Sequence, residues 1–600
     1  IMAMATKSIP QLTTDILVVG GGTGGTAAAI QAARRGVKTI LVSEGPWLGG
    51  MLTSAGVAAP DGNELAAWQT GSWGQFLRTL QTQQPGGLDH GWVSLFTFDP
   101  RLGAKIFADW VAELPTLTWI THQFPVEALK NGDRLVGVRF PDYEIRARVI
   151  LDGTELGDLL ALGDIDHRWG WDWQDKFDEP SCPVAPNGMT EKYPIQSPTW
   201  VFLLRKTTNS QTNIIAEPTI DVAQDFSNTW QNHGEKDFLT YGQLPGEHYM
   251  INWPIAGNDY GRDLDRLLGS EKEREAYLRE AYQYSYAYAH YLQKYHSENL
   301  ELATGIFPQT GELSTAFALH PYYRESRRLK GQQVITERDI LPQGQVASLP
   351  IHNQKVSSIA VGNYANDHHY PGYEFPLAPK SLIWGGRWTG TPFTIPFEAL
   401  LSPTVRGYLP CEKNISVSHM ANGSTRLQPL VMNTGQAVGM IAALSIEKNC
   451  DPQDLDVRDV QEALIGDRQA PAAVIPLFNL APDHPEWRQW QRYYLDNPDQ
   501  YPPSGHCPVD VNLARLPFSK SQCVYSGELQ KSDNQTYQLT CQQLGKVLKV
   551  ITERPEVAEQ LINCAHGQKI TLGGRYNPAG NWLVVETVET ITSGKDLGGR

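Results

Sequence analysis

The 600-residue chain is 41% hydrophobic and 19% charged, and 50 basic against 65 acidic side chains give a formal net charge of −15. At about 150 residues per domain, this length predicts several structural units with sizeable cores, and the composition excludes a disordered chain. Without a stripe of basic residues, the acidic balance argues against nucleic acid or a membrane surface as partner and favours a small-molecule substrate. Nothing in the sequence indicates an oligomeric state.

Neither a membrane span nor a metal site is predicted. The longest apolar stretches, such as residues 16–19 and 27–30, are far shorter than the roughly 18 residues of a transmembrane candidate. The first dozen residues contain no apolar core of a secretory signal. The seven cysteines show no CxxC or CxxH spacing, so we expect reduced thiols in a cytoplasmic protein.

The strongest local signal begins at residue 15, where DILVVG predicts a short buried strand. Gly20, Gly22 and Gly25 then occupy the three positions of a GxGxxG turn, and AAAIQAARRG and VKTILV follow as helix and second strand. The glycines permit a tight turn and close approach of a pyrophosphate, and the helix N-terminus offers free N–H groups to its phosphates. This order predicts a Rossmann-like dinucleotide-binding unit.

The residue that binds the ribose hydroxyls is expected about 20 residues after the first glycine. That position holds Ser43, and Glu44 follows it. Both can hydrogen-bond a ribose, so both are candidates, although Glu44 can also be a solvated loop charge.

Three later segments favour FAD as the dinucleotide. Gly49 and Gly50 remove side chains beside the expected pyrophosphate. A strand at 149–152 ends in a Gly/Thr turn, and a helix opens near Pro429 with its positive end available to a reduced flavin. An NAD(P)-dependent dehydrogenase without flavin remains an alternative, because it shares the first unit.

Taken together, the motifs resemble the FAD-dependent oxidoreductase family of the glutathione-reductase-like flavoproteins, a generically described group sometimes mislabelled xanthan lyase. The resemblance covers roughly residues 12–465. The motifs that carry it are VVGGGTGGTAAA, WLGGMLTSAG, FDPRLG, LDGTELGDLL, YYRESRRLKG, IAVGNYANDHH, FTIPFEALLSP, SHMANGSTRLQP and NTGQAVGMIAAL. It implies noncovalent FAD in an α/β, Rossmann-like domain interrupted by an inserted α+β substrate domain.

The resemblance also implies which residues surround the cofactor. They are Gly20, Gly22, Gly25, Gly49, Gly50, Gly153, Thr154, Asp158, Gly435, Gln436 and Ala437. Met51 adjoins the glycine pair and is a further candidate, and Val126 is expected to meet adenine through its backbone. This chain departs from the family pattern at Ser43 and at Gln428, where a glutamate is frequent.

Catalytic candidates are sought on segments that return to the flavin. His419 precedes the second helix by ten residues, and an imidazole with a pKa of roughly 6.5 can remove a proton at neutral pH. Arg426 can hold a carboxylate or the pyrimidine edge of the flavin. His369 belongs to a Asp-His-His run on a loop beside flavin or substrate, where adjacent side chains point apart and disfavour a metal site. A structural hydrogen bond or ion pair is the alternative for His419 and Arg426.

Two dense clusters remain open to two interpretations. The run YYRESRR at 322–328 is either an ion-pair network between domains or a substrate anchor. The tryptophans of 167–177 either line an apolar substrate pocket or anchor a loop.

We expect five segments: the first part of the FAD domain at 12–164, a cap at 165–385 with a helix at about 270–297, the second FAD part at 386–470, a connector at 471–515 and a small β module at 516–595. We expect the module to be an OB-like barrel with an intramolecular or oligomer-contact role, although such barrels often bind oligonucleotides. The predicted function is FAD-dependent oxidation of an alcohol or amine carbon. The alternative is a structural FAD whose β module binds a macromolecule.

Overall fold

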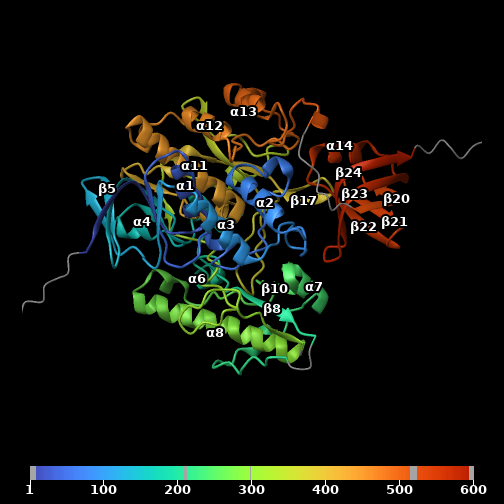
Figure 1. Ribbon diagram of the computed structural model, residues 1–600, viewed down its shortest axis with the longest axis horizontal. Coiled ribbons are helices and arrows are strands. Elements are labelled where there is room, and N and C mark those ends of the chain that lie inside the picture. Colours follow the sequence, from blue (N-terminus) through green and yellow to red (C-terminus); the bar gives the residue numbers. More distant parts are fainter. Residues whose placement is uncertain (1–8, 209–211, 298, 514–522, 593–600) are drawn as a thin grey trace, which may run out of the picture.

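A central sheet, a smaller cap and a C-terminal barrel make up the chain (Figure 1). The computed structural model describes residues 9–208, 212–297, 299–513 and 523–592, so the predicted boundaries at 515, 516 and 595 lie outside the described residues. Around the three parts lie the helices α2 (Gly71–Gln83), α3 (Pro100–Ala112), α10 (His419–Thr425), α12 (Val457–Ile465) and α13 (Trp487–Asp496).

The central sheet has seven strands in the order β3-β2-β1-β6-β5-β4, with β19 paired to β6. Its parallel strands are β1 (Gln11–Val19), β2 (Thr39–Val42), β3 (Leu117–Ile120), β6 (Glu144–Asp152) and β19 (Tyr408–Pro410), and β4 (Glu127–Asn131) and β5 (Arg134–Arg139) add an antiparallel edge. Ile16 and Leu17 are fully buried in two different hydrophobic clusters, because both faces of the sheet are covered. The sheet confirms the predicted Rossmann-like α/β fold.

Helices from opposite ends of this domain pack on each other. α1 (Thr23–Arg34) and α11 (Gln428–Lys448) lie side by side (Figure 1), and a Cβ on Gly435 would stand 2.2 Å from the Gly24 carbonyl oxygen. Such close backbone approach requires glycine at the crossing. The first and second predicted FAD segments therefore share one core.

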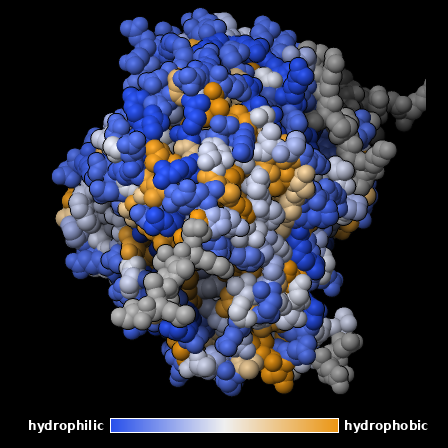
Figure 2. Space-filling view, turned by 60° about the vertical axis from the view of Figure 1, so that its left-hand side comes forward, coloured by the Kyte–Doolittle hydropathy of each residue, from blue (hydrophilic) through white to orange (hydrophobic). Residues whose placement is uncertain are grey.

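By length and composition, α11 is the one helix among the described residues that could cross a membrane, but 94% of its apolar window is buried inside the protein. It is the core helix of this domain. On the face shown in Figure 2, hydrophobic residues lie in groups separated by hydrophilic ones.

The cap is built on a four-stranded antiparallel sheet covered by one long helix. The strands are β8 (Phe202–Lys206), β9 (Gln243–Leu244), β10 (His248–Ile251) and β11 (Leu300–Leu302), in the order β11-β8-β10-β9. Helix α8 (Glu271–Tyr295) begins with a capping box between Ser270 and Glu273, and its buried face includes Tyr277 and Tyr288. The predicted helix at 270–297 is confirmed.

Five strands close into a barrel at the C-terminal end, in the order β20-β21-β22-β24-β23. Their bounds are β20 (Cys523–Lys531), β21 (Tyr537–Cys541), β22 (Lys546–Ile551), β23 (Gln568–Asn577) and β24 (Trp582–Thr592), and α14 (Pro555–Asn563) lies between β22 and β23. A small barrel was predicted here, and the closed order with one helix before β23 fits an OB-like fold.

The barrel is docked against the body of the protein. Trp582 donates a hydrogen bond to Asp89, and the Arg387 guanidinium lies 4.9 Å from the centre of the Trp582 ring. Arg387 in turn forms a two-pronged pair with Glu64, at 2.8 and 3.0 Å. These contacts give the barrel an intramolecular role and connect it to the loop around residue 64.

Candidate functional site

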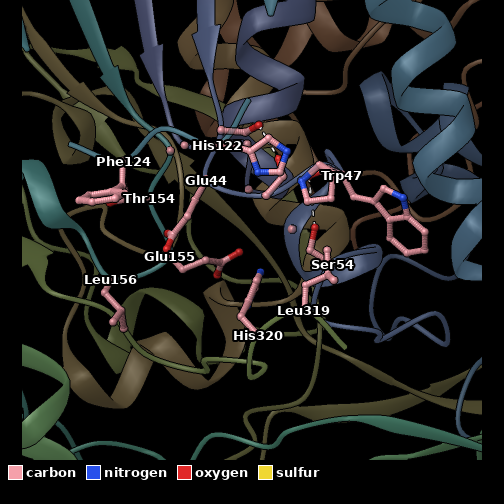
Figure 3. A pocket seen from close by; sticks show the side chains of 18 of the residues that line it. Glu44, Trp47, Ser54, His122, Phe124, Thr154, Glu155, Leu156, Leu319 and His320 are labelled. Carbon is pink, nitrogen blue, oxygen red and sulfur yellow. Dashed lines mark hydrogen bonds between the residues drawn. The ribbon is translucent and has the colours of Figure 1, made fainter. Parts of the chain in front are cut away.

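A cavity of about 520 Å³ opens at the carboxyl ends of β1, β2 and β6. Figure 3 shows Glu44, Glu155 and His320 projecting towards its centre, with Phe124 and Leu156 on one side and Trp47, Ser54 and Leu319 on the other. Ligands of open α/β sheets bind at this edge, where the strands end.

The cavity wall along residues 20–22 is bare backbone. Gly20 has φ +101°, and a Cβ there would lie 2.4 Å from Gly153; a Cβ on Gly22 would lie 2.5 Å from a Glu412 carboxylate oxygen and 2.9 Å from the Gly153 carbonyl oxygen. Gly50 is also left-handed, with φ +52°. An extended ligand can therefore run along the main chain, and the N-terminus of α1 faces it, which fits the pyrophosphate of a dinucleotide.

The second glycine segment is bonded to the first. The Gly49 N–H donates to the Gly21 carbonyl oxygen at 3.1 Å, and Thr23 donates its hydroxyl to the Gly49 carbonyl oxygen at 2.7 Å. Gly50 lines the cavity, whereas Gly49 and Met51 lie behind the lining, and Met51 is fully buried. The structure thus brings the two predicted glycine segments together, with Met51 as core.

Residues 153–158 continue the cavity wall beside the glycine turn. Asp152 accepts hydrogen bonds from the Thr154 N–H and hydroxyl, and Thr154 accepts one from the Asp158 N–H. Asp158 also pairs with Arg327 at 3.1 Å. Gly153, Thr154 and Asp158 all line the cavity, while Gly25 supports the turn from behind, since a Cβ there would stand 2.1 Å from the Gly20 carbonyl oxygen.

Ser43 and Glu44 both line the cavity, in the place expected for ribose contacts. The Ser43 hydroxyl already donates to the Gly45 carbonyl oxygen and accepts from the Trp119 indole, whereas burial raises the pKa of the Glu44 carboxyl, which has no hydrogen bond in the described chain. Glu44 is therefore the freer of the two. Val126 differs from its expected place: its N–H donates to the Arg139 carbonyl oxygen, and residues 122–125 line the cavity in its stead.

The expectation for Gly435, Gln436 and Ala437 needs correction. They lie one to two turns inside α11, and none of them lines the cavity. Gly435 packs on Gly24, and the Gln436 side chain bonds the Ser72 N–H and the Ala470 carbonyl oxygen. Their physical role is to join two helices. The sequence motif cannot distinguish a helix-packing role from a cofactor-binding role, because small residues permit both close helix packing and close ligand approach.

Sequence reasoning missed a buried charge cluster under the α1 N-terminus. The Gly24 N–H donates to the Glu412 carboxylate at 2.6 Å, and Lys413 pairs with Glu155 at 2.5 Å. Burial raises the pKa of Glu412 to about 7, against the opposing effect of Lys413. Glu412 and Lys413 follow β19, which pairs in parallel with β6. A prediction of that strand pairing would have placed both residues at this edge of the sheet.

A second, smaller cavity of about 40 Å³ lies nearby and is strongly polar. Its lining combines two cations, two carboxylates, one imidazole, three phenols and two amides with four apolar groups: Val57, Ala59, Asp61, Tyr241, Met250, Asn252, Tyr322, Arg324, Tyr364, Asp367, His369, Arg426, Leu427 and Gln428. Two predicted catalytic residues, Arg426 and His369, thus meet here, beside the first turn of α11.

An unbroken series of ion pairs holds these groups. Arg426 donates to the Asp367 carboxylate at 3.1 Å and to the Tyr322 hydroxyl at 2.8 Å. His369 contacts Asp367 through Nε2 at 2.9 Å and Asp259 through Nδ1 at 2.6 Å, and Arg324 lies 3.3 Å from Asp259. Burial and Arg324 oppose protonation of His369, but the two carboxylates outweigh them and raise its pKa.

His369 has no free ring nitrogen to accept a proton in this arrangement, because both ring nitrogens face carboxylates and act as donors. It holds Asp367 and Asp259 in place, and Asp367 in turn holds Arg426.

Asp61, Tyr241 and Tyr364 differ from the ion-paired groups of the lining. Within the described residues, their side chains form no hydrogen bond or ion pair, although burial, reinforced by Glu64, raises the pKa of Asp61 to about 8. Asp61 was missed from the sequence, because Pro-Asp-Gly at 60–62 is typical of an exposed turn.

The prediction for His419 also needs correction. Its ring is fully buried and lines neither of these cavities, with Nδ1 2.7 Å from a Glu325 carboxylate oxygen and Nε2 2.6 Å from the Tyr370 hydroxyl. Trp171, from the tryptophan-rich run, packs against it with 3.9 Å between the ring centroids and a tilt of 37°. Trp171 is partly buried against the core and donates to the Tyr193 carbonyl oxygen, which favours the interpretation that it anchors a loop.

The run at 322–328 serves both cavities and the network between the domains. Tyr323 lines the first cavity, and Tyr322 and Arg324 line the second. The fully buried Arg328 donates to the Gly170 and Val417 carbonyl oxygens. Ser54 likewise lines the first cavity and Val57 the second. The two short segments 54–57 and 322–324 therefore each contribute to both cavities.

A Rossmann-like sheet and a bare glycine wall that faces a helix N-terminus are the features of a dinucleotide-binding flavoprotein or dehydrogenase, and a polar chamber lies beside them. Residues 15–464 match the family described as FAD dependent oxidoreductase, and this chain belongs to that family. FAD is its cofactor, and FAD-dependent redox chemistry is its class of reaction.

Similarity to individual proteins is more limited. The sarcosine oxidase alpha subunits of Corynebacterium sp. strains P-1 and U-96 are each 46% identical over 55 residues, which is 9% of this chain and 6% of theirs. Among solved structures, a geranylgeranyl bacteriochlorophyll reductase-like protein from Thermoplasma acidophilum covers 76% of this chain, with 84% of its own length, 9% identity and a TM-score of 0.33. The p-nitrophenol 4-monooxygenase PnpA of Pseudomonas putida DLL-E4 covers 54%, with 70% of its own length, 12% identity and a TM-score of 0.27.

Proposed function

We propose that this enzyme oxidises a small organic molecule by removing a hydride from a carbon that carries a hydroxyl or amino group. Bound FAD supplies the electron-accepting chemistry, at N5 of its ring. The proposal is supported by one observation above all: segments 54–57 and 322–324 each contribute to both the dinucleotide cavity and the polar chamber.

The residues of the chamber suit a small polar group. With about 40 Å³, it has room for the reacting end of a molecule and little else. Arg426 is fixed by Asp367 and Tyr322, so its charge is held at one position. We infer that Arg426 orients the substrate and that the remainder of the substrate lies outside the chamber.

Anaerobic reduction of the purified, FAD-loaded protein tests the proposal. A panel of amines, alcohols and hydroxy acids is mixed with the enzyme, and loss of the visible flavin absorption is followed. We expect at least one class to bleach the flavin, and we expect Arg426→Met to raise the concentration required while the bound FAD per chain stays unchanged. A protein that binds FAD and is reduced only by dithionite would contradict the proposal and favour a structural role for FAD.

A further inference from the structure

We propose that Asp61 is the proton acceptor of the substrate chamber, taking the proton from the substrate hydroxyl or amino group as that group is oxidised. This inference rests on the proposed function and adds a catalytic residue to it. The chemistry balances when the O–H or N–H proton passes to the Asp61 carboxylate, the C–H hydride and its two electrons pass to oxidised flavin, and a C=O or C=N bond forms.

The first argument is elimination within the chamber. A proton acceptor needs a free lone pair, and both nitrogens of His369 already face carboxylates. The Asp367 carboxylate accepts from His369 and Arg426, which hold its pKa well below the usual range despite its burial. Arginine side chains cannot accept a proton. Of the acidic and basic side chains that line the chamber, Asp61 alone has neither a hydrogen bond nor an ion pair within the described chain.

The second argument is that the loop carrying Asp61 is fixed from two sides. Asn63 is bonded to strand β15 (Ser358–Asn363): its side chain donates to the Val361 carbonyl oxygen at 3.0 Å and accepts from the Asn363 N–H at 2.9 Å. Glu64 is clamped by Arg387, which packs on the barrel residue Trp582. A carboxyl on so constrained a loop is held in place without any bond of its own, as a reacting group requires.

Charges around Asp61 leave its proton affinity in a useful range. Burial is the main influence, Glu64 and Asp367 act in the same direction, and Arg387 and Arg426 oppose them, so the pKa is raised to about 8. General bases are most effective when their pKa lies near the working pH. Tyr241, Tyr322, Tyr364, His369 and Arg324 complete the surroundings from the cap and from the loops that follow it.

The experiment compares the FAD-loaded wild type with Asp61→Asn, Asp61→Glu and the control Asp133→Asn, an exposed aspartate of the β4–β5 hairpin. Flavin reduction by the most active panel compound is measured anaerobically from pH 6 to pH 10. We expect the wild-type rate constant to rise with pH as Asp61 ionises, Asp61→Asn to be slower by at least 100-fold with no rise, and Asp61→Glu to recover part of both. Asp133→Asn should match the wild type.

A second measurement needs no substrate. The infrared carbonyl band of a protonated carboxyl should disappear between pH 6 and pH 10 in the wild type, with a component that is missing from Asp61→Asn. An Asp61→Asn enzyme reduced within threefold of the wild-type rate would overturn the assignment while leaving the proposed function intact. Absence of the Asp61 infrared component would overturn it as well, whereas failure of every compound to reduce any variant would count against the proposed function itself.

Discussion

Replacement of Gly22 by alanine tests whether the bare glycine wall is the FAD site. The new Cβ would lie 2.9 Å from the Gly153 carbonyl oxygen, which is backbone, and 2.5 Å from a Glu412 carboxylate oxygen. Overpacking of this kind costs about 1–3 kcal/mol. Gly22 and Gly153 both line the cavity, so a shift that relieves this clash changes the wall itself, and we expect at least a tenfold rise in the FAD dissociation constant, which corresponds to about 1.4 kcal/mol.

Quenching of flavin fluorescence during titration of the apoprotein measures this constant, and thermal unfolding measures the packing cost. Gly188→Ala is the matched control, because a Cβ on this first residue of α6 (Gly188–Lys192) meets nothing within 4 Å. It should leave FAD affinity unchanged. If Gly22→Ala bound FAD within twofold of the wild type, the cofactor would not follow this wall, and the reasoning from glycine geometry would be wrong.

Three further predictions concern core and interface. His419→Ala should destabilise the protein by about 3–5 kcal/mol, because the buried Glu325 loses one of its partners and a cavity forms in the core; an unchanged thermal midpoint with abolished flavin reduction would restore a catalytic role for His419. Burial raises the pKa of Glu553 to about 7, so the folded protein keeps this proton over a pH range in which the unfolded chain loses it. The protein should therefore lose up to about 3 kcal/mol of stability as pH rises from about 4.5 to 7. Glu553→Gln should show a flatter dependence of the unfolding midpoint on pH, and parallel wild-type and variant curves would refute this. Trp582→Ala should weaken the docking of the barrel by about 3–5 kcal/mol and speed tryptic cleavage between body and barrel. Equal cleavage rates for variant and wild type would show that the contacts of Trp582 with Asp89 and Arg387 do not hold the barrel.

The sequence predicted those parts of the fold whose signals are local. The GxGxxG turn lies between a strand and a helix that are adjacent in the chain, and the barrel strands are separated by clear turn residues. Most of the cofactor wall followed from these signals, including Gly20, Gly22 and Gly153.

Side-chain roles could not be predicted in the same way. His419 and His369 have the same chemistry in the sequence, but one packs under Trp171 in the core and the other lines a cavity, since segments more than 90 residues away determine their surroundings. Asp61 lies in a turn motif that normally faces water, and distant segments, among them β15 and the hairpin of Arg387, pack against its loop. Long-range packing decides such cases.

The pairing of α1 with α11 also bears on how the protein is made. About 400 residues separate the two helices, and at about 5–20 residues per second a ribosome needs roughly 20–80 s to synthesise the intervening chain. During that time the nascent nucleotide-binding half exposes an apolar helix face that has no permanent neighbour. Chaperone supply and growth temperature should therefore govern the yield of native enzyme, and a fragment that stops before α11 should aggregate when expressed.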